Sequence, residues 1–243
     1  ARIVVQVVYY FYSHFRLSEK NKKSVFSVPT GNFGDIYAGY IAKKMGLPIS
    51  KLVIATNSND ILKRVIKTGI YKPLKVEHTV SPSMDIQISS NLERFIFELF
   101  EGDGKKVKNL FEEFRSDGNV RVDSDTAAKF SNSWVGYSFD DEEVVKCISS
   151  EAENSGIILD PHSAIGLLAA RSHRDKQLDL EIPIVSLATA HPAKFPESSR
   201  KAGFENDPEL PPHMTDLFDR KERYTIQANN IQDIQKFIAE NIS

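Results

Sequence analysis

The sequence has few of the features that mark secreted, membrane-embedded or nucleic-acid-binding proteins. Its single cysteine, Cys147, excludes a framework of disulfide bonds and fits a reducing compartment. No apolar run reaches the ~20 residues that a membrane-spanning helix requires. The 31 Lys and Arg residues nearly balance the 33 Asp and Glu residues, so no basic field attracts a phosphate backbone. We therefore expect a cytoplasmic globular protein without nucleic-acid or membrane partners.

Several catalytic motifs are also missing. The 6 histidines have no metal-ligand spacing and cysteine is almost absent, so we expect no metal site. The G-x-S-x-G elbow of the α/β-hydrolases does not occur. Cys147 lies beside Val144 and Ile148 at helical spacing, which favours a small core residue over a nucleophile.

The order of the predicted elements indicates an α/β fold with a mostly parallel sheet and flanking helices. Residues 24–28 predict a strand, and residues 36–45 predict a helix after a glycine-rich loop. Residues 51–55 predict a second strand, and residues 61–66 carry apolar side chains at helical spacing. This alternation is typical of parallel sheets. Residues 182–188 predict a further buried strand.

Residues 86–156 depart from this alternation. They predict a long amphipathic helix over residues 86–100, further helices after it, and no convincing strand. We therefore divide the chain into an α/β core, residues 1–85 and 157–243, and a helical insertion, residues 86–156.

The chain opens within an apolar segment, residues 3–12. This segment lacks the basic start and the small-residue cleavage site of a signal peptide. A buried helix or strand of a core is the simplest interpretation. Because no cap or turn chemistry precedes it, we expect that the natural protein continues upstream and that this chain is a C-terminal portion.

The strongest local signal for chemistry is Gly31-Asn32-Phe33-Gly34-Asp35, between a predicted strand and a predicted helix. In such a loop the backbone N–H groups and the positive end of the helix face the bound ligand, and glycine lets an anion approach closely. A phosphate group is the expected ligand. The loop is neither a Walker A motif nor a complete dinucleotide fingerprint. A tight turn between strand and helix explains its glycines equally well.

A second signal follows the last predicted strand of the sheet. Thr189 and His191 lie there, and ligands of open α/β sheets bind beyond the carboxyl ends of strands. A strand that simply ends in small residues and a proline is an equal alternative. On the predicted long helix, Arg94 could bind a carboxylate or phosphate group, although a solvated face explains Ser89, Asn91 and Arg94 as well.

Taken together, these segments resemble threonine synthases of the branch found in fungi and many bacteria. The similar segments occur in the family's order along nearly the whole chain. They are SVPTGNFGD (27–35), KKMGLP (43–48), ATNSNDIL (55–62), SPSMDI (81–86), SSNLER (89–94), LDPHSA (159–164) and TAHPAKF (189–195).

The resemblance implies a fold, a cofactor and an activity. The fold is tryptophan-synthase-β-like, which is fold type II of the enzymes that use pyridoxal 5'-phosphate (PLP). The activity is that of a lyase in threonine biosynthesis, which converts O-phospho-L-homoserine and water into L-threonine and phosphate.

The resemblance also implies roles for individual residues. The hydroxyl of Thr189 is expected to face the pyridine nitrogen of PLP, and a neutral partner leaves that nitrogen largely unprotonated. The backbone of five residues is expected to bind the cofactor phosphate: Gly31, Asn32, Phe33, Gly34 and Asp35. Five others are expected to contact the substrate: Ser89, Asn91, Arg94, Asp160 and His162.

One part of the family's site has no counterpart here. In the family, the lysine that forms a Schiff base with PLP lies in a Phe-Lys-Asp context well upstream of the glycine loop, and no such motif precedes Gly31. We therefore expect no catalytic residue in this chain and no activity from the chain alone. Two alternatives remain open. They are a related phospholyase that releases 2-oxobutyrate, and a non-catalytic remnant that binds PLP or a phosphorylated metabolite.

Overall fold

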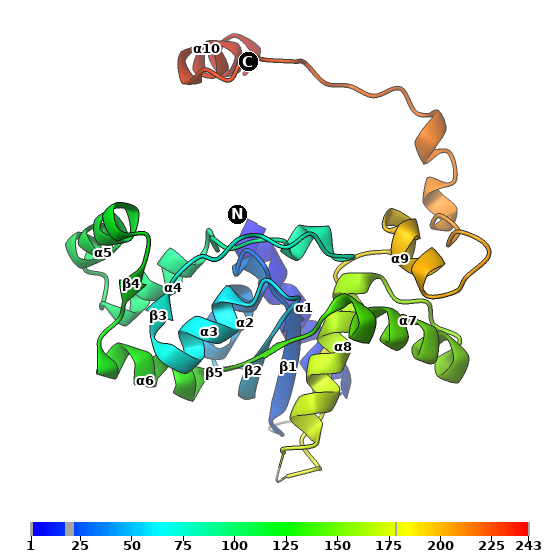
Figure 1. Cartoon of the computed structure of the whole chain (residues 1–243), viewed down its shortest axis with the longest axis horizontal. Helices are drawn as coiled ribbons and strands as arrows, with labels where there is room; N and C mark the ends of the chain where they lie inside the picture. Colours follow the sequence, from blue (N-terminus) through cyan, green and yellow to red (C-terminus); the bar gives the residue numbers. More distant parts are fainter. Residues whose placement is uncertain (1, 18–21, 178, 243) are drawn as a thin grey trace. The chain divides into compact units, whose positions relative to one another are not determined.

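The computed structural model describes residues 2–17, 22–177 and 179–242 (Figure 1). The chain divides into two compact units, Ala1–Pro208 and Glu209–Ser243. The second unit contains short helical turns and one α-helix. Its elements are η3 (Pro212–Met214), η4 (Leu217–Asp219) and α10 (Ile231–Asn241).

The first unit is built on a four-stranded sheet. The strand order is β5-β2-β1-β6, and each neighbouring pair is parallel. The prediction of a parallel sheet with flanking helices is therefore confirmed. The strands of this sheet are β1 (Ser24–Pro29), β2 (Ile49–Thr56), β5 (Trp134–Ser138) and β6 (Ile184–Ser186), while β3 (Ile70–Tyr71) and β4 (Val120–Arg121) pair separately and antiparallel.

Helices cover both faces of this sheet (Figure 1). On one face α1, α2, α3 and α4 contribute to the core, and on the other α7 and α8 do. The helices of the first unit are α1 (Arg2–Leu17), α2 (Gly34–Lys44), α3 (Ile61–Thr68), η1 (Pro82–Met84), α4 (Leu92–Leu99), α5 (Gly104–Asp117), α6 (Ser124–Ser133), α7 (Asp141–Ser155), α8 (Pro161–Arg174), η2 (Pro192–Lys194) and α9 (Pro196–Lys201).

Alternate residues of the central strands enter two different hydrophobic cores. Phe26 and Leu52 pack on the side of α1 and α2, whereas Val25 and Val53 pack on the side of α7 and α8. This division follows from the pleat, because successive side chains of a strand point to opposite faces. All residues of β1 are buried, as expected of a strand in a parallel sheet with both faces covered.

Only one face of α1 packs against the rest of the first unit. Tyr10 is fully buried, and a Cβ atom at Gly39 of α2 would lie 2.5 Å from its ring. Only glycine therefore allows α1 and α2 to pack this closely. The sequence predicted a buried element over residues 3–12. This prediction is wrong for the face of α1 that points away from α2, because that face is exposed. The exposed apolar residues there are Val4, Val5, Val8, Tyr9, Tyr12 and Phe15.

A strand of the main sheet lies in the segment for which the sequence predicted only helices. β5 pairs with β2 from Leu52↔Trp134 to Thr56↔Ser138. The expectation of no strand within residues 86–156 is therefore wrong, whereas the division into core and insertion stays a prediction. A five-residue edge strand with Gly136 at its centre shows little pattern in the sequence. Its place is decided by tertiary contacts, including those of Trp134 with Phe33.

The helix predicted over residues 86–100 begins only at Leu92. The preceding residues form turns, and Asn91 donates its backbone N–H to the carbonyl of Asn32 at 3.1 Å. Ser89 likewise donates its N–H to the hydroxyl of Tyr71 at 2.7 Å. These long-range bonds replace the helical ones, and they bring this segment against the glycine loop.

Candidate functional site

A cavity of about 650 Å³ lies beyond the carboxyl ends of β1 and β6. This volume is within the usual range of sites for small ligands. The structure brings most of the predicted site residues to its wall: Gly31, Asn32, Gly34, Asp35, Asn91, Arg94, His162 and Thr189. Phe33, Ser89 and Asp160 lie behind this wall, as described below.

The glycine loop forms the N-terminal end of α2. Phe33 takes a left-handed backbone conformation with φ 66°, which is uncommon for a residue with a side chain. Its buried ring packs against Trp134 with the ring centroids 5.2 Å apart. Gly34 donates its N–H to Oδ1 of Asn32 at 2.9 Å, whereas the side chain of Phe33, the N-cap residue, makes no capping hydrogen bond. Apart from that of Gly34, the first-turn N–H groups are thus available to a ligand in the cavity.

Segment 83–91 supports this loop from behind. A Cβ atom at Gly31 would lie 3.1 Å from the carbonyl oxygen of Ser83 and 3.2 Å from Cα of Met84, so a side chain there would have to displace the backbone of η1 slightly. Ser89 donates its hydroxyl to the carbonyl of Gly31 at 2.7 Å. Ser89 is buried, so the structure places it as a support of the loop.

Asn91 and Arg94 lie together at the start of α4. Asn91 donates its Nδ2 to the carbonyl of Asn32 at 3.0 Å and accepts at Oδ1 from Nε of Arg94 at 3.1 Å. Arg94 is exposed and lines the cavity. Its guanidinium is therefore the cationic group through which α4 can meet an anion in the cavity.

Asp160 holds two cavity residues in place from beneath the wall. Its buried carboxylate caps α8 and lies 2.9 Å from Nδ1 of His162. It also accepts a hydrogen bond from the hydroxyl of Ser163, which in turn accepts the backbone N–H of Thr189 at 3.1 Å. Asp160 therefore orients His162 directly and Thr189 through Ser163.

The ring of His162 is fixed on both edges. Nε2 accepts the backbone N–H of Ser83 at 3.3 Å, so the proton of the neutral ring is on Nδ1, facing Asp160. The ring of Phe195 packs on it with the centroids 4.6 Å apart. His162 is thus a rigid part of the wall.

Asp35 is the acidic group at this wall, and its environment is unfavourable for charge. Burial raises the pKa of its carboxyl to about 6, and a hydrogen bond from the hydroxyl of Tyr10 lowers this pKa in part. The same hydroxyl donates to the backbone carbonyl of Asp35 at 2.7 Å. Burial and the nearby carboxyl raise the pKa of Tyr10 well above its ordinary value.

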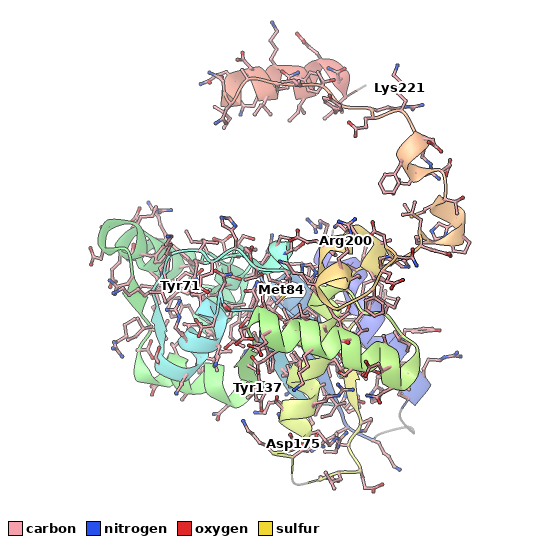
Figure 2. The ribbon with its side chains drawn as sticks, turned by 45° about the vertical axis from the view of Figure 1, so that its right-hand side comes forward. Tyr71, Met84, Tyr137, Asp175, Arg200 and Lys221 are labelled. Carbon is pink, nitrogen blue, oxygen red and sulfur yellow. The ribbon has the colours of Figure 1, made fainter. Side chains whose placement is uncertain are left out.

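The structure adds cavity residues to which the sequence analysis assigned no role. Among them, Ser83, Met84, Lys194 and Phe195 belong to segments 81–86 and 189–195, whose similarity to threonine synthases was the available signal (Met84 is labelled in Figure 2). No motif marked the added cavity residues of α1 and α2, which are Arg2, Ile3, Val4, Gln6, Tyr37 and Ile41. His191, in contrast, accepts the N–H of Ala193 at 3.3 Å and caps η2, and it is not among the lining residues.

Metal ligands, membrane-spanning helices and the cysteine were the remaining features that the sequence analysis considered. No three His, Cys, Asp or Glu side chains among them are grouped so as to hold a metal ion. Within the same residues no helix combines the length and apolar character needed to cross a membrane. Cys147 is buried near the carbonyl of Ala164, and burial raises the pKa of its thiol, which suits the predicted core role.

Comparison with known proteins identifies the relatives of this chain. Residues 163–238 match the family model described as threonine synthase, C-terminal. The chain is 43% identical over 241 residues to threonine synthase of Pseudomonas aeruginosa, covering 99% of this chain and 51% of that protein. For threonine synthase of Saccharomyces cerevisiae the identity is 45% over 224 residues, covering 85% of this chain and 44% of that protein.

A solved structure gives the same relationship. The crystal structure of PLP-bound threonine synthase from Brucella melitensis matches with a TM-score of 0.86 and 41% identity, over 98% of this chain and 50% of that chain. The chain is homologous to the C-terminal portion of threonine synthases. It spans about half the length of the relatives that it matches. The predicted fold class, that of fold type II PLP enzymes, is confirmed by this similarity.

Proposed function

We propose that the complete protein to which this chain belongs is a threonine synthase. It converts O-phospho-L-homoserine and water into L-threonine and phosphate, and it uses PLP as its cofactor. The observation that carries this proposal is the glycine loop at the start of α2, which opens into the cavity together with Thr189 in a chain homologous to threonine synthases.

The residues of the cavity fit PLP. The N-terminal turn of α2 offers the positive end of the helix dipole and its backbone N–H groups, other than that of Gly34, to the cofactor phosphate. The positive φ of Phe33 is a cost that such a cradle explains. Thr189 also lines the cavity and offers a hydroxyl that would meet the pyridine nitrogen. When bound, PLP supplies an electron sink for chemistry at the substrate carbons.

The chain's own residues then bind and orient. The backbone of residues 31–35 would hold the phosphate of the cofactor, and Thr189, being neutral, would leave the pyridine nitrogen without a charged partner. His162 shapes the wall beside Phe195, because Asp160 and Ser83 occupy both of its ring nitrogens. Asn91 orients the guanidinium of Arg94, which binds an anionic group of the phosphorylated substrate.

The test uses the complete protein, because the resemblance places the PLP-linked lysine outside residues 1–243. The protein is supplied with PLP and O-phospho-L-homoserine, and the carbon product is identified. We expect L-threonine with equimolar phosphate, and we expect Arg94→Gln to raise the KM for the substrate about tenfold or more. Formation of 2-oxobutyrate instead would make the protein a phospholyase, and no turnover of a PLP-loaded protein would contradict the proposed substrate.

We further propose that the protein acts in the cytoplasm. The single cysteine supports this location, because it fits a reducing compartment. Fractionation of cells that express the complete protein tests the proposal, and recovery with a sealed organelle would contradict it.

A further inference from the structure

The segment that joins β3 to α4 supplies one wall of the cavity, although η1 is its only helical turn. Ser83 and Met84 of η1 line the cavity, and their backbone lies against Gly31. An irregular segment of this kind keeps its shape only when its polar groups are bound elsewhere in the protein. The position of this wall therefore depends on the side chains that fix the segment.

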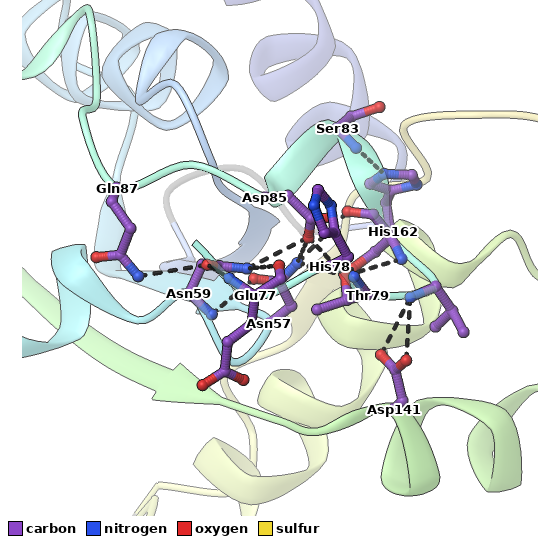
Figure 3. A network of polar contacts seen from close by, with 12 residues as sticks. Asn57, Asn59, Glu77, His78, Thr79, Ser83, Asp85, Gln87, Asp141 and His162 are labelled. Carbon is purple, nitrogen blue, oxygen red and sulfur yellow. Dashed lines mark hydrogen bonds and ion pairs between the residues drawn. The ribbon is translucent and has the colours of Figure 1, made fainter. Parts of the chain in front are cut away.

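The carboxylate of Asp85 is the centre of the network that fixes it (Figure 3). Oδ1 accepts hydrogen bonds from Nδ2 of Asn57 at 2.9 Å and from the hydroxyl of Thr79 at 2.7 Å. Nδ2 of Asn59 adds a third at 3.3 Å, and Oδ2 accepts the backbone N–H of Thr79 at 3.0 Å. The side chain of Asp85 is only 9% exposed, so these charge-assisted bonds are shielded from water.

Two of these donors belong to the end of the sheet. Asn57 directly follows β2, and both Asn57 and Asn59 are buried. Oδ1 of Asn57 accepts the N–H of Asn59 at 2.9 Å, and Oδ1 of Asn59 accepts the N–H of Glu77 at 3.0 Å. Because each amide oxygen has its own donor, each NH₂ group is turned toward Asp85. Asp85 therefore ties the segment to the carboxyl end of β2.

We propose that Asp85 is a positioning residue of the candidate site. Its carboxylate holds η1 against the end of β2. In that position η1 places the N–H of Ser83 on Nε2 of His162 and the backbone of Met84 over Gly31. Asp85 does not line the cavity, so it acts through these neighbours. The link to catalysis rests on the proposed function, because the same cavity is concerned.

The substitution Asp85→Asn, made in the complete protein, tests this role. It preserves size but replaces one acceptor oxygen by an NH₂ group. In one orientation of the new amide, its NH₂ group faces the NH₂ groups of Asn57 and Asn59. In the other orientation it faces the N–H of Thr79. Because two donors cannot bond each other, the four hydrogen bonds cannot all be kept. We expect the Kd for PLP to rise about tenfold and kcat/KM to fall by about 10- to 100-fold. The ¹⁵N signals of the His162 ring should shift, because Ser83 no longer holds Nε2 in place.

The control is Asp123→Asn. Asp123 accepts the N–H and the hydroxyl of Thr126, both at 2.8 Å, and does not line this cavity. It should lower the thermal midpoint but leave the Kd for PLP and the His162 signals unchanged. If Asp85→Asn behaves in the same way as this control, the proposal is wrong.

Two further outcomes remain decisive. If Asp85→Asn does not fold, Thr79→Val is the second variant. It removes the hydroxyl bond to Asp85, together with the bonds of that hydroxyl to Asn57 and Ser81, and keeps the backbone N–H on Asp85. A shift in the same direction is expected, and its absence contradicts the proposal. If the wild-type protein forms no threonine, the proposed function fails. The His162 signals, recorded without PLP or substrate, then still decide whether Asp85 positions the wall.

Discussion

The residues around the glycine loop show how a binding site is maintained at a cost in stability. Asp35 contributes its backbone to the start of α2 and carries a carboxyl that burial disfavours as an anion. Tyr10 compensates in part, because its hydroxyl donates to both the carbonyl and the carboxyl of Asp35. The cost in stability comes from the side chain of Asp35, whereas the proposed binding of phosphate uses its backbone.

This separation predicts the effect of Asp35→Asn on stability. The pKa of this carboxyl is 3.8 in the unfolded state and about 6 in the folded state. Between these two pH values the folded state therefore holds a proton that the unfolded state has lost. The free energy of unfolding therefore falls as the pH rises through this window and stays lower above it. An amide carries no such penalty. The free energy of unfolding of Asp35→Asn, measured relative to that of the wild type, should therefore be higher at pH 7.5 than at pH 4.5, by at most about 3 kcal/mol.

Urea unfolding of both proteins at the two pH values measures this gain. A difference between variant and wild type that is the same at both pH values would show that the carboxyl is not buried as described. The Kd for inorganic phosphate serves as a second measurement. It should be the same in the variant and the wild type, because the substitution leaves the backbone of the loop unchanged.

At the scale of elements, the contact between α1 and α2 determines how the start of α2 is held. Gly39 lies where α1 crosses α2, and a Cβ atom there would also lie 2.9 Å from Cδ2 of Leu52. Gly39→Ala should therefore destabilise the protein by about 1–3 kcal/mol through overpacking, although alanine is the better helix former.

The midpoint of urea unfolding of the complete protein tests this prediction. Gly104→Ala is the matched control, because nothing lies within 4 Å of a Cβ atom at this helical position. It should leave stability unchanged or raise it slightly. Equal effects of the two substitutions would mean that α1 does not approach α2 at Gly39.

At the scale of the whole molecule, the exposed face of α1 predicts the behaviour of the 243-residue polypeptide. Val4 and Val8 are 70% and 60% exposed, and Tyr12 and Phe15 continue the same face at 62% and 66%. A contiguous apolar face of this kind drives association in water. We expect the isolated polypeptide to self-associate, and we expect Val8→Glu combined with Phe15→Glu to reduce this association.

Sedimentation velocity at increasing concentration measures the association. Phe218→Glu combined with Ile226→Glu is the matched control, because it adds the same charge at exposed apolar positions outside α1. A soluble wild-type monomer with a cooperative thermal transition would contradict the prediction.

Local sequence determined a large part of this protein. β1, the glycine loop and α2 follow from residues that are neighbours in the chain, and the predicted strand and helix are confirmed. The cavity likewise brings together Gly31, His162 and Thr189, which come from three separate segments of the family's pattern. Such features can be predicted from the sequence because each depends on short-range preferences or on a recognisable motif.

Only the tertiary structure decided the rest. β5 joins the sheet through its pairing with β2, and residues 86–91 leave the helix predicted for them in order to bind the glycine loop. The roles of Ser89 and Asp160 as supports, rather than cavity groups, depend on partners far away in sequence or on burial. The physical reason is the same in each case: a hydrogen bond or a packed ring from a distant segment outweighs the weak local preference of a few residues.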